Sequence, residues 1–116
     1  MSVNELSIQS KEFAKHIVLT CRWMKGKGVE YALIDQLLRS GTSIGANIHE
    51  AKHAQSTRDF ISKYEIALKE CGECLYWLDL LFSTACIKKQ TYSILKAECT
   101  SLQRMLASSV IKLKAR

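Results

Sequence analysis

The chain has 116 residues, no proline and five glycines, and 47% of its residues are hydrophobic. This length fits one domain. The hydrophobic fraction is large enough to form a buried core, so the composition excludes intrinsic disorder. The lack of proline favours long helices, because proline breaks helix interiors. Seventeen basic residues against eleven acidic residues give a net charge of +6, which favours a polyanionic partner such as nucleic acid.

Two helical patterns occupy the first half of the chain, over residues 6–25 and 31–53. Apolar side chains recur every three or four residues in both, and a Gly-Lys-Gly breaker separates them. The second pattern contains Gly41-x-x-x-Gly45 within its apolar stripe. A glycine in a helix interior costs about 1 kcal/mol relative to alanine, so we expect this pair to allow the close approach of another helix backbone.

Two further helical patterns cover residues 57–85 and 88–114. The segment Ser56-x-x-Asp59 resembles a capping box and predicts the start of the third helix. No segment alternates with a period of two, so we expect no strands. Because the connections are short, consecutive helices become antiparallel neighbours. The predicted fold is therefore one all-α domain over residues 1–116, an antiparallel up-down-up-down four-helix bundle.

The third helix carries a second apolar face, formed by Tyr76, Trp77 and Leu80, opposite its main apolar stripe. A helix that is apolar on two sides is usually buried on both, whereas a helix of a four-helix monomer meets water on one side. We therefore expect these three residues to contact another subunit of a homo-oligomer, since aromatic residues favour interfaces. The alternative is partial cover by helix ends or by the stems of long side chains.

Positive charge is concentrated in the fourth helix. Residues 87–116 carry seven basic residues and one acidic residue, which equals the net charge of the whole chain. We expect Lys89, Lys96, Arg104 and Lys114 to project from the outward face, with Lys112 and Arg116 towards the flank. Such a line can neutralise phosphates without reading bases. Complementing the helix dipole is an alternative role for the basic residues of the last turn.

A metallopeptidase motif, His49-Glu50-x-x-His53, ends the second helical pattern. On a helix the two histidines share one side and could bind zinc, with Glu50 as the general base. A third ligand is missing, because the facing part of the third helix offers only Asp59, which the capping box uses. We therefore expect no metal site, no cofactor and no enzymatic activity, and keep a zinc metallopeptidase as a remote alternative.

The five cysteines lie at positions 21, 71, 74, 86 and 99, and this odd number argues against a disulfide framework. Cys71-x-x-Cys74 resembles half of a zinc or redox motif, but both residues lie in the apolar stripe, where a free cysteine packs as a small hydrophobe. The sequence contains no signal-peptide pattern and no apolar stretch of transmembrane length. We therefore expect a cytoplasmic protein without membrane contact.

Residues 37–51, LLRSGTSIGANIHEA, resemble the signature of the bacterial four-helix-bundle family named for 23S rRNA intervening-sequence proteins, also called S23 ribosomal proteins. The resemblance covers about residues 35–82, and it includes Asp59-Phe60-Ile61 and Tyr76-Trp77-Leu78. Carried onto this chain, the motif residues of the second helix are Arg39, Ser40, Ser43, Asn47 and Glu50. Neither histidine of the metallopeptidase motif belongs to the family pattern.

The resemblance implies a small cytosolic bundle that assembles into a ring-like homopentamer and has no established enzymatic activity. A similar group is the accessory variability determinant of diversity-generating retroelements, a basic pentamer that binds nucleic acid and a reverse transcriptase. Two hypotheses follow for this chain. It is an oligomer that binds RNA or DNA through the basic surface of the fourth helix, or it is a scaffold for a protein partner without nucleic-acid binding.

Overall fold

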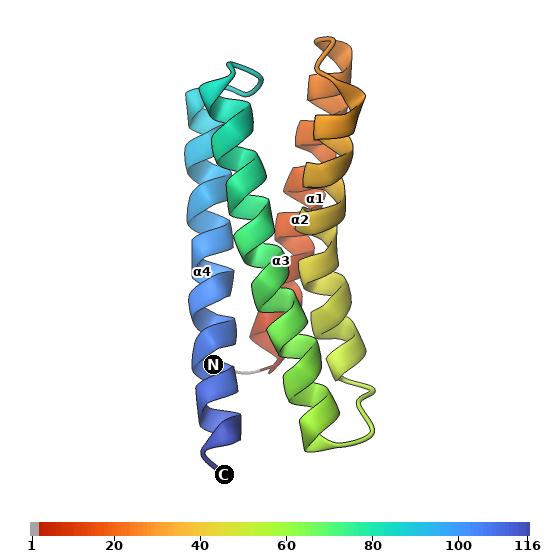
Figure 1. Ribbon diagram of the computed structural model, residues 1–116, viewed down its shortest axis with the longest axis vertical. Coiled ribbons are helices and arrows are strands. Elements are labelled where there is room, and N and C mark those ends of the chain that lie inside the picture. Colours follow the sequence, from red (N-terminus) through yellow and green to blue (C-terminus); the bar gives the residue numbers. More distant parts are fainter. Residues whose placement is uncertain (1–2) are drawn as a thin grey trace.

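The computed structural model describes residues 3–116. They form four helices, with no strand among them: α1 (Val3–Gly26), α2 (Tyr31–Ala51), α3 (Thr57–Ser83) and α4 (Lys89–Lys114). The all-α prediction with four helices is confirmed. Consecutive helices run in opposite directions, and the α1–α2 and α3–α4 turns lie at the same end (Figure 1). Each helix packs on two neighbours, and α1 meets α4, so the molecule is an elongated bundle of 48 × 21 × 19 Å.

The core is built from the apolar stripes of all four helices. Each stripe repeats at three- and four-residue intervals, which places its members on one face of a helix. The largest fully buried side chains are Leu6, Phe13, Ile17, Met24, Ile34, Leu37, Ile44, Ile48, Tyr64, Leu78, Leu81 and Leu95. Ser10, Thr20 and Ser40 are also buried. The hydroxyl groups of these three residues donate to carbonyl oxygens of their own helices, which meets their need for hydrogen bonds.

The glycine pair of α2 lies against α1. A Cβ atom added to Gly41 would come within 2.8 Å of Cγ1 of Ile17, and one added to Gly45 would lie 3.3 Å from Oγ of Ser10. These distances leave no free room for a side chain at Gly41 and little at Gly45. The expected close approach of a second helix is therefore confirmed, and α1 is that helix.

Two helices are shorter at their C-terminal ends than the sequence predicts. Helix α2 ends at Ala51 and not at residue 53, because the chain tightens into a turn in which His53 N donates to Glu50 O at 3.0 Å. Helix α3 ends at Ser83 and not at residue 85. Ala85 adopts a left-handed φ of 61°, and Cys86 N donates to Leu81 O at 2.8 Å. This closure turns the chain and leaves Ala85 exposed.

The predicted cap of α3 is present. Oγ of Ser56 accepts a hydrogen bond from Asp59 N at 3.0 Å, which satisfies one of the free N–H groups of the first turn. Oδ2 of Asp59 accepts from Gln55 N at 3.4 Å, one residue before the position of the usual reciprocal bond. Asp59 is thus held at the start of α3, where its charge also complements the helix dipole.

Candidate nucleic-acid interface

The basic side chains of α4 are all exposed, but they divide into two groups. Lys96 and Lys114 lie on the edge of α4 that faces α3, and each meets a carboxylate there. Lys96 Nζ is 3.6 Å from Oδ1 of Asp79, and Lys114 Nζ is 2.9 Å from Oε2 of Glu65. Both lysines therefore differ from the outward placement expected from the sequence, and part of their charge is already balanced within the bundle.

The surroundings of Lys96 extend its ion pair into a small network. Its Nζ donates to Oη of Tyr92 at 2.9 Å, and the Tyr92 hydroxyl donates in turn to Asp79. The hydrogen bond to Tyr92, followed by the charge of Asp79, raises the pKa of Lys96. The ring of Tyr92 stacks on Phe82 of α3 with centroids 4.3 Å apart. These contacts fix Lys96 against the α3–α4 seam.

The second group of α4 cations has no carboxylate partner in the part of the chain that the structure describes. This group comprises Lys89, Arg104, Lys112 and Arg116. A rise of 1.5 Å per residue spreads Lys89 and Lys112 over about 35 Å of helix, with Arg104 between them. The structure thus places a sparse row of free cations along α4. At 3.6 residues per turn, Lys89 and Lys112 point about 140° apart, so this row winds around the exposed side of the helix and does not follow one line.

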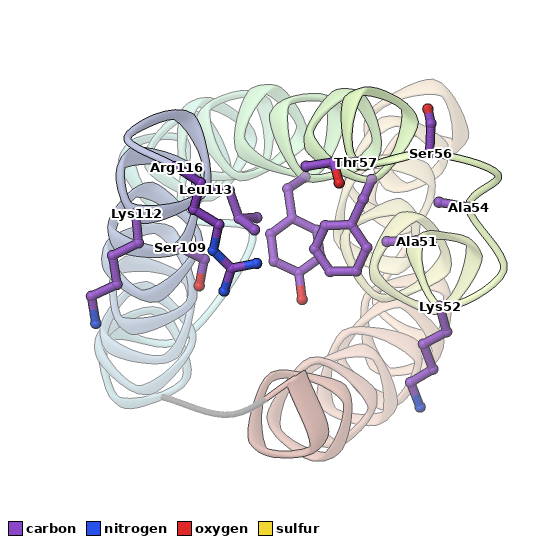
Figure 2. A pocket seen from close by; sticks show the side chains of 11 residues that line it. Ala51, Lys52, Ala54, Ser56, Thr57, Ser109, Lys112, Leu113 and Arg116 are labelled. Carbon is purple, nitrogen blue, oxygen red and sulfur yellow. The ribbon is translucent and has the colours of Figure 1, made fainter.

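A pocket of about 490 Å³ opens at the end of the bundle where α2 and α4 finish and α3 begins. Figure 2 shows Arg116 extending towards the opening, whereas the amines of Lys52 and Lys112 point away from it into solvent. Phe60 and Tyr64 line the pocket, and the buried Tyr64 hydroxyl finds no hydrogen-bond partner among the described residues. Burial raises the pKa of Tyr64, so this hydroxyl stays neutral.

A group of aromatic and basic side chains that the sequence reasoning missed lies at the opposite end of the bundle. The ring of Trp23 has Lys27 Nζ at 5.6 Å and Lys88 Nζ at 5.5 Å from its centroid. Lys25 Nζ lies 5.2 Å from the ring centroid of Tyr31. The sequence contains a signal for this group, because Trp23 lies outside the regular apolar stripe of its helix and has basic residues next to it.

Three of the five family-motif residues of α2 take part in hydrogen bonds within their own helix. Ser40 is buried, and its Oγ donates to Gln36 O at 2.9 Å. Asn47 Nδ2 donates to Ser43 O at 2.9 Å, which keeps its side chain on its own helix. The remaining two motif residues, Arg39 and Glu50, are exposed. The charge of Arg39 opposes the rise in the pKa of Glu70, a rise that is caused first by burial and then by Glu73.

The metallopeptidase motif does not form a ligand set. The rings of His49 and His53 meet edge to face with centroids 5.6 Å apart, and both residues are exposed. His53 follows the end of α2, so the two histidines do not share a regular helix. In residues 3–116, no group of three or more His, Cys, Asp or Glu side chains could hold a metal ion.

Four of the five thiols are buried in the core, and Cys86 is half-buried. Cys99 Sγ donates to Cys71 O at 3.5 Å across the α3–α4 contact. A hydrogen bond with Cys99, followed by burial, raises the pKa of Cys74. Burial raises the pKa of Cys21 to about 11. The Cys71-x-x-Cys74 pair is thus part of the helix packing, and its buried thiols are poor nucleophiles.

The three residues expected at a subunit interface lie close together but differ in exposure. Tyr76 is 60% exposed, and its ring meets Trp77 edge to face with centroids 4.9 Å apart. Trp77 and Leu80 are half-buried, and Trp77 packs partly against the core. Tyr76 is therefore the part of this patch that is free to contact another molecule.

The bundle and its charge distribution define a small all-α protein with a basic fourth helix. The family of 23S rRNA-intervening sequence proteins matches residues 4–108, and the chain belongs to this family. A similar crystal structure is that of a protein of unknown function from the S23 ribosomal protein family of Bacteroides thetaiotaomicron. It is 43% identical, with a TM-score of 0.91 over 95% of this chain and 98% of that one. The resemblance recognised from residues 37–51 is thus confirmed.

No curated protein shows significant similarity to the chain. Within residues 3–116, none of the helices combines the length and the apolar character that a membrane span requires.

Proposed function

We propose that this protein is a non-enzymatic, cytoplasmic homo-oligomer that binds RNA or DNA through the basic surface of α4. The observation that carries the proposal is the row of unpaired cations, Lys89, Arg104, Lys112 and Arg116, on a helix segment that holds the net charge of the chain. Helix-dipole complementarity accounts for cations in the last turn, but it does not account for Lys89 or Arg104, which lie outside that turn.

The mechanism is phosphate neutralisation. Exposed lysine and arginine side chains displace condensed counterions from a phosphate backbone, which supplies affinity without sequence preference. Lys96 and Lys114 contribute less in this scheme, because Asp79 and Glu65 hold them. A symmetric oligomer repeats the row, and linked copies raise the overall affinity even when each contact is weak.

We propose the exposed part of the Tyr76, Trp77 and Leu80 patch as the contact between subunits, and a pentamer as the assembly. Tyr76 gives a clean test because it is more than half exposed, so the change to glutamate leaves the core intact. Tyr31→Glu is the matched control, since Tyr31 is 69% exposed on another helix. Light scattering should show that only Tyr76→Glu reduces the mass. A monomeric wild-type protein would refute the oligomer.

The nucleic-acid role is tested by two double variants that remove the same charge. Arg104→Gln with Lys112→Gln removes unpaired cations, whereas Lys96→Gln with Lys114→Gln removes paired ones. With a fluorescent duplex at low salt, the first variant should bind about fivefold to tenfold more weakly than wild type, and the second should change less. Equal effects would mean that net charge alone controls binding, and would contradict a role for the row.

The competing function is a scaffold for a protein partner without nucleic-acid binding. Its specific support is the exposed ring of Tyr76, since aromatic residues are enriched in protein interfaces. A wild-type protein that binds neither RNA nor DNA, and a co-purifying protein that survives nuclease treatment and is lost with Tyr76→Glu, would favour this alternative.

A further inference from the structure

The α1–α2 and α3–α4 turns lie at one end of the bundle (Figure 1). Trp23, near the end of α1, forms the centre of a basic and aromatic surface at this end. It is 39% exposed near the end of α1, and two lysine amines lie within 5.6 Å of its ring centroid. One of these lysines, Lys27, follows α1, whereas the other, Lys88, is the N-cap of α4. The surface therefore joins the C-terminal end of α1 and the N-terminal start of α4 around one indole ring.

Tyr31 adds a second ring to this end. It is 69% exposed at the start of α2, and Lys25 Nζ lies 5.2 Å from its centroid. Neither Lys25 nor the two lysines around Trp23 forms an ion pair with a carboxylate of residues 5–116. Exposed aromatic rings accompanied by unneutralised cations are the combination that single-stranded nucleic acid uses, because bases stack on the rings while phosphates meet the cations.

A slot beside Trp23 gives this surface a shape. Its volume is about 260 Å³, and it lies between α1 and α4, lined by Leu19, Thr20, Trp23, Lys88 and Thr91. None of these five lining residues is acidic. The Thr20 hydroxyl donates to His16 O at 2.8 Å, which leaves its oxygen able to accept a hydrogen bond. The slot thus combines the ring of Trp23, the hydroxyl groups of two threonines and the amine of Lys88. This combination suits a nucleotide, whose base is a flat polar ring and whose phosphate is an anion.

We infer that this end of the bundle binds single-stranded RNA or DNA, with an unstacked base in the slot against Trp23 and adjacent phosphates on Lys27 and Lys88. The inference rests on the proposed nucleic-acid function and adds a contact that only a single strand can make, since bases paired in a duplex are stacked on each other and cannot stack on a side chain. Lys88 and Lys89 are consecutive at the start of α4, so a strand held at Trp23 continues onto the cation row.

The test compares two substitutions at Trp23 with two forms of the same oligonucleotide. Trp23→Leu keeps apolar bulk but removes the aromatic face, whereas Trp23→Phe keeps a ring. The probes are a fluorescent single strand and its duplex, and thermal unfolding confirms that both variants fold. Trp23→Leu should weaken single-strand binding by about tenfold, because stacking on one ring contributes about that much per base. Trp23→Phe should retain most of the affinity, and neither change should affect the duplex.

A fluorescence measurement gives an independent readout. The chain has two tryptophans, so Trp77→Phe leaves Trp23 as the single indole reporter. A base stacked on Trp23 should quench its emission on addition of the single strand but not of the duplex. The inference fails, and the proposed function stands, if the wild type binds single strands, Trp23→Leu binds them equally well, and the Trp77→Phe protein shows no quenching. If the wild type binds neither form, the proposed function and the inference both fail.

Discussion

Replacing glycine by alanine should have opposite effects at two positions of this bundle. In an exposed helix interior the change stabilises by about 1 kcal/mol, because alanine loses less conformational freedom on folding. Gly72 of α3 is exposed, and an added Cβ meets nothing within 4 Å, so Gly72→Ala should give this full gain. For a domain of this length, that corresponds to a rise in the melting temperature of about 4 °C.

At Gly41 the same methyl group meets the core. It would lie 2.8 Å from Cγ1 and 2.9 Å from Cγ2 of Ile17, which is fully buried. These atoms are next to the branch point of a stiff side chain, so they cannot rotate away freely. Overpacking of this kind costs about 1–3 kcal/mol, which cancels or exceeds the helix gain. Gly41→Ala should therefore be about 1 kcal/mol less stable than wild type and about 2 kcal/mol less stable than Gly72→Ala.

Urea unfolding followed by circular dichroism measures both variants, with the protein concentration held constant because an oligomer's stability depends on it. A double-mutant cycle isolates the contact. In an Ile17→Ala background the clashing atoms are gone, so Gly41→Ala should become neutral or stabilising. The packing argument is refuted if Gly41→Ala is as stable as Gly72→Ala in the otherwise unchanged protein.

Three further substitutions or treatments have effects that follow from single features. Ala85→Gly should stabilise by about 0.5–1 kcal/mol, since Ala85 holds a left-handed φ of 61° that glycine adopts freely; unchanged urea midpoints would contradict this. Burial and Glu73 raise the pKa of Glu70, so its folded form binds a proton more readily than its unfolded form, and Glu70→Gln should stabilise the protein at pH 7. That gain should shrink as the pH falls from the raised pKa of folded Glu70 towards the usual glutamate pKa, and a gain that persists in acid would disagree. A thiol reagent should label Cys86 first in the native protein and reach the others only on unfolding; the protected residues are Cys21, Cys71, Cys74 and Cys99.

Much of the fold could be predicted because local signals agree with one another. The Gly-Lys-Gly segment marks the end of α1, where Gly28 has a φ of 76°, and Ser56 marks the start of α3. The glycine spacing of α2 predicts a close helix contact, but it does not identify Ile17 as the neighbour, because that choice depends on the register between two helices. The end of α3 differs from the predicted end because alanine rarely adopts the left-handed conformation found at Ala85.

The candidate site was less predictable, because charge pairing between helices depends on their rotation about their own axes. The sequence alone places Lys96 and Arg104 in one basic group, whereas the structure brings only Lys96 to a carboxylate of α3. The indole of Trp23 likewise gains its second lysine, Lys88, from a helix more than sixty positions away in the chain. Contacts of this kind join residues that are far apart in the chain, so no local sequence pattern predicts them.

The most direct test of the nucleic-acid proposal is the salt dependence of binding to a duplex. Each phosphate contact contributes a slope of about 0.9 to the logarithmic plot of affinity against salt concentration. The wild type should lose affinity steeply as salt increases, and the variant that lacks Arg104 and Lys112 should show a slope smaller by about 2 for each bound subunit. Affinity that does not change with salt, or an unchanged slope in this variant, would contradict phosphate binding by the unpaired row of α4.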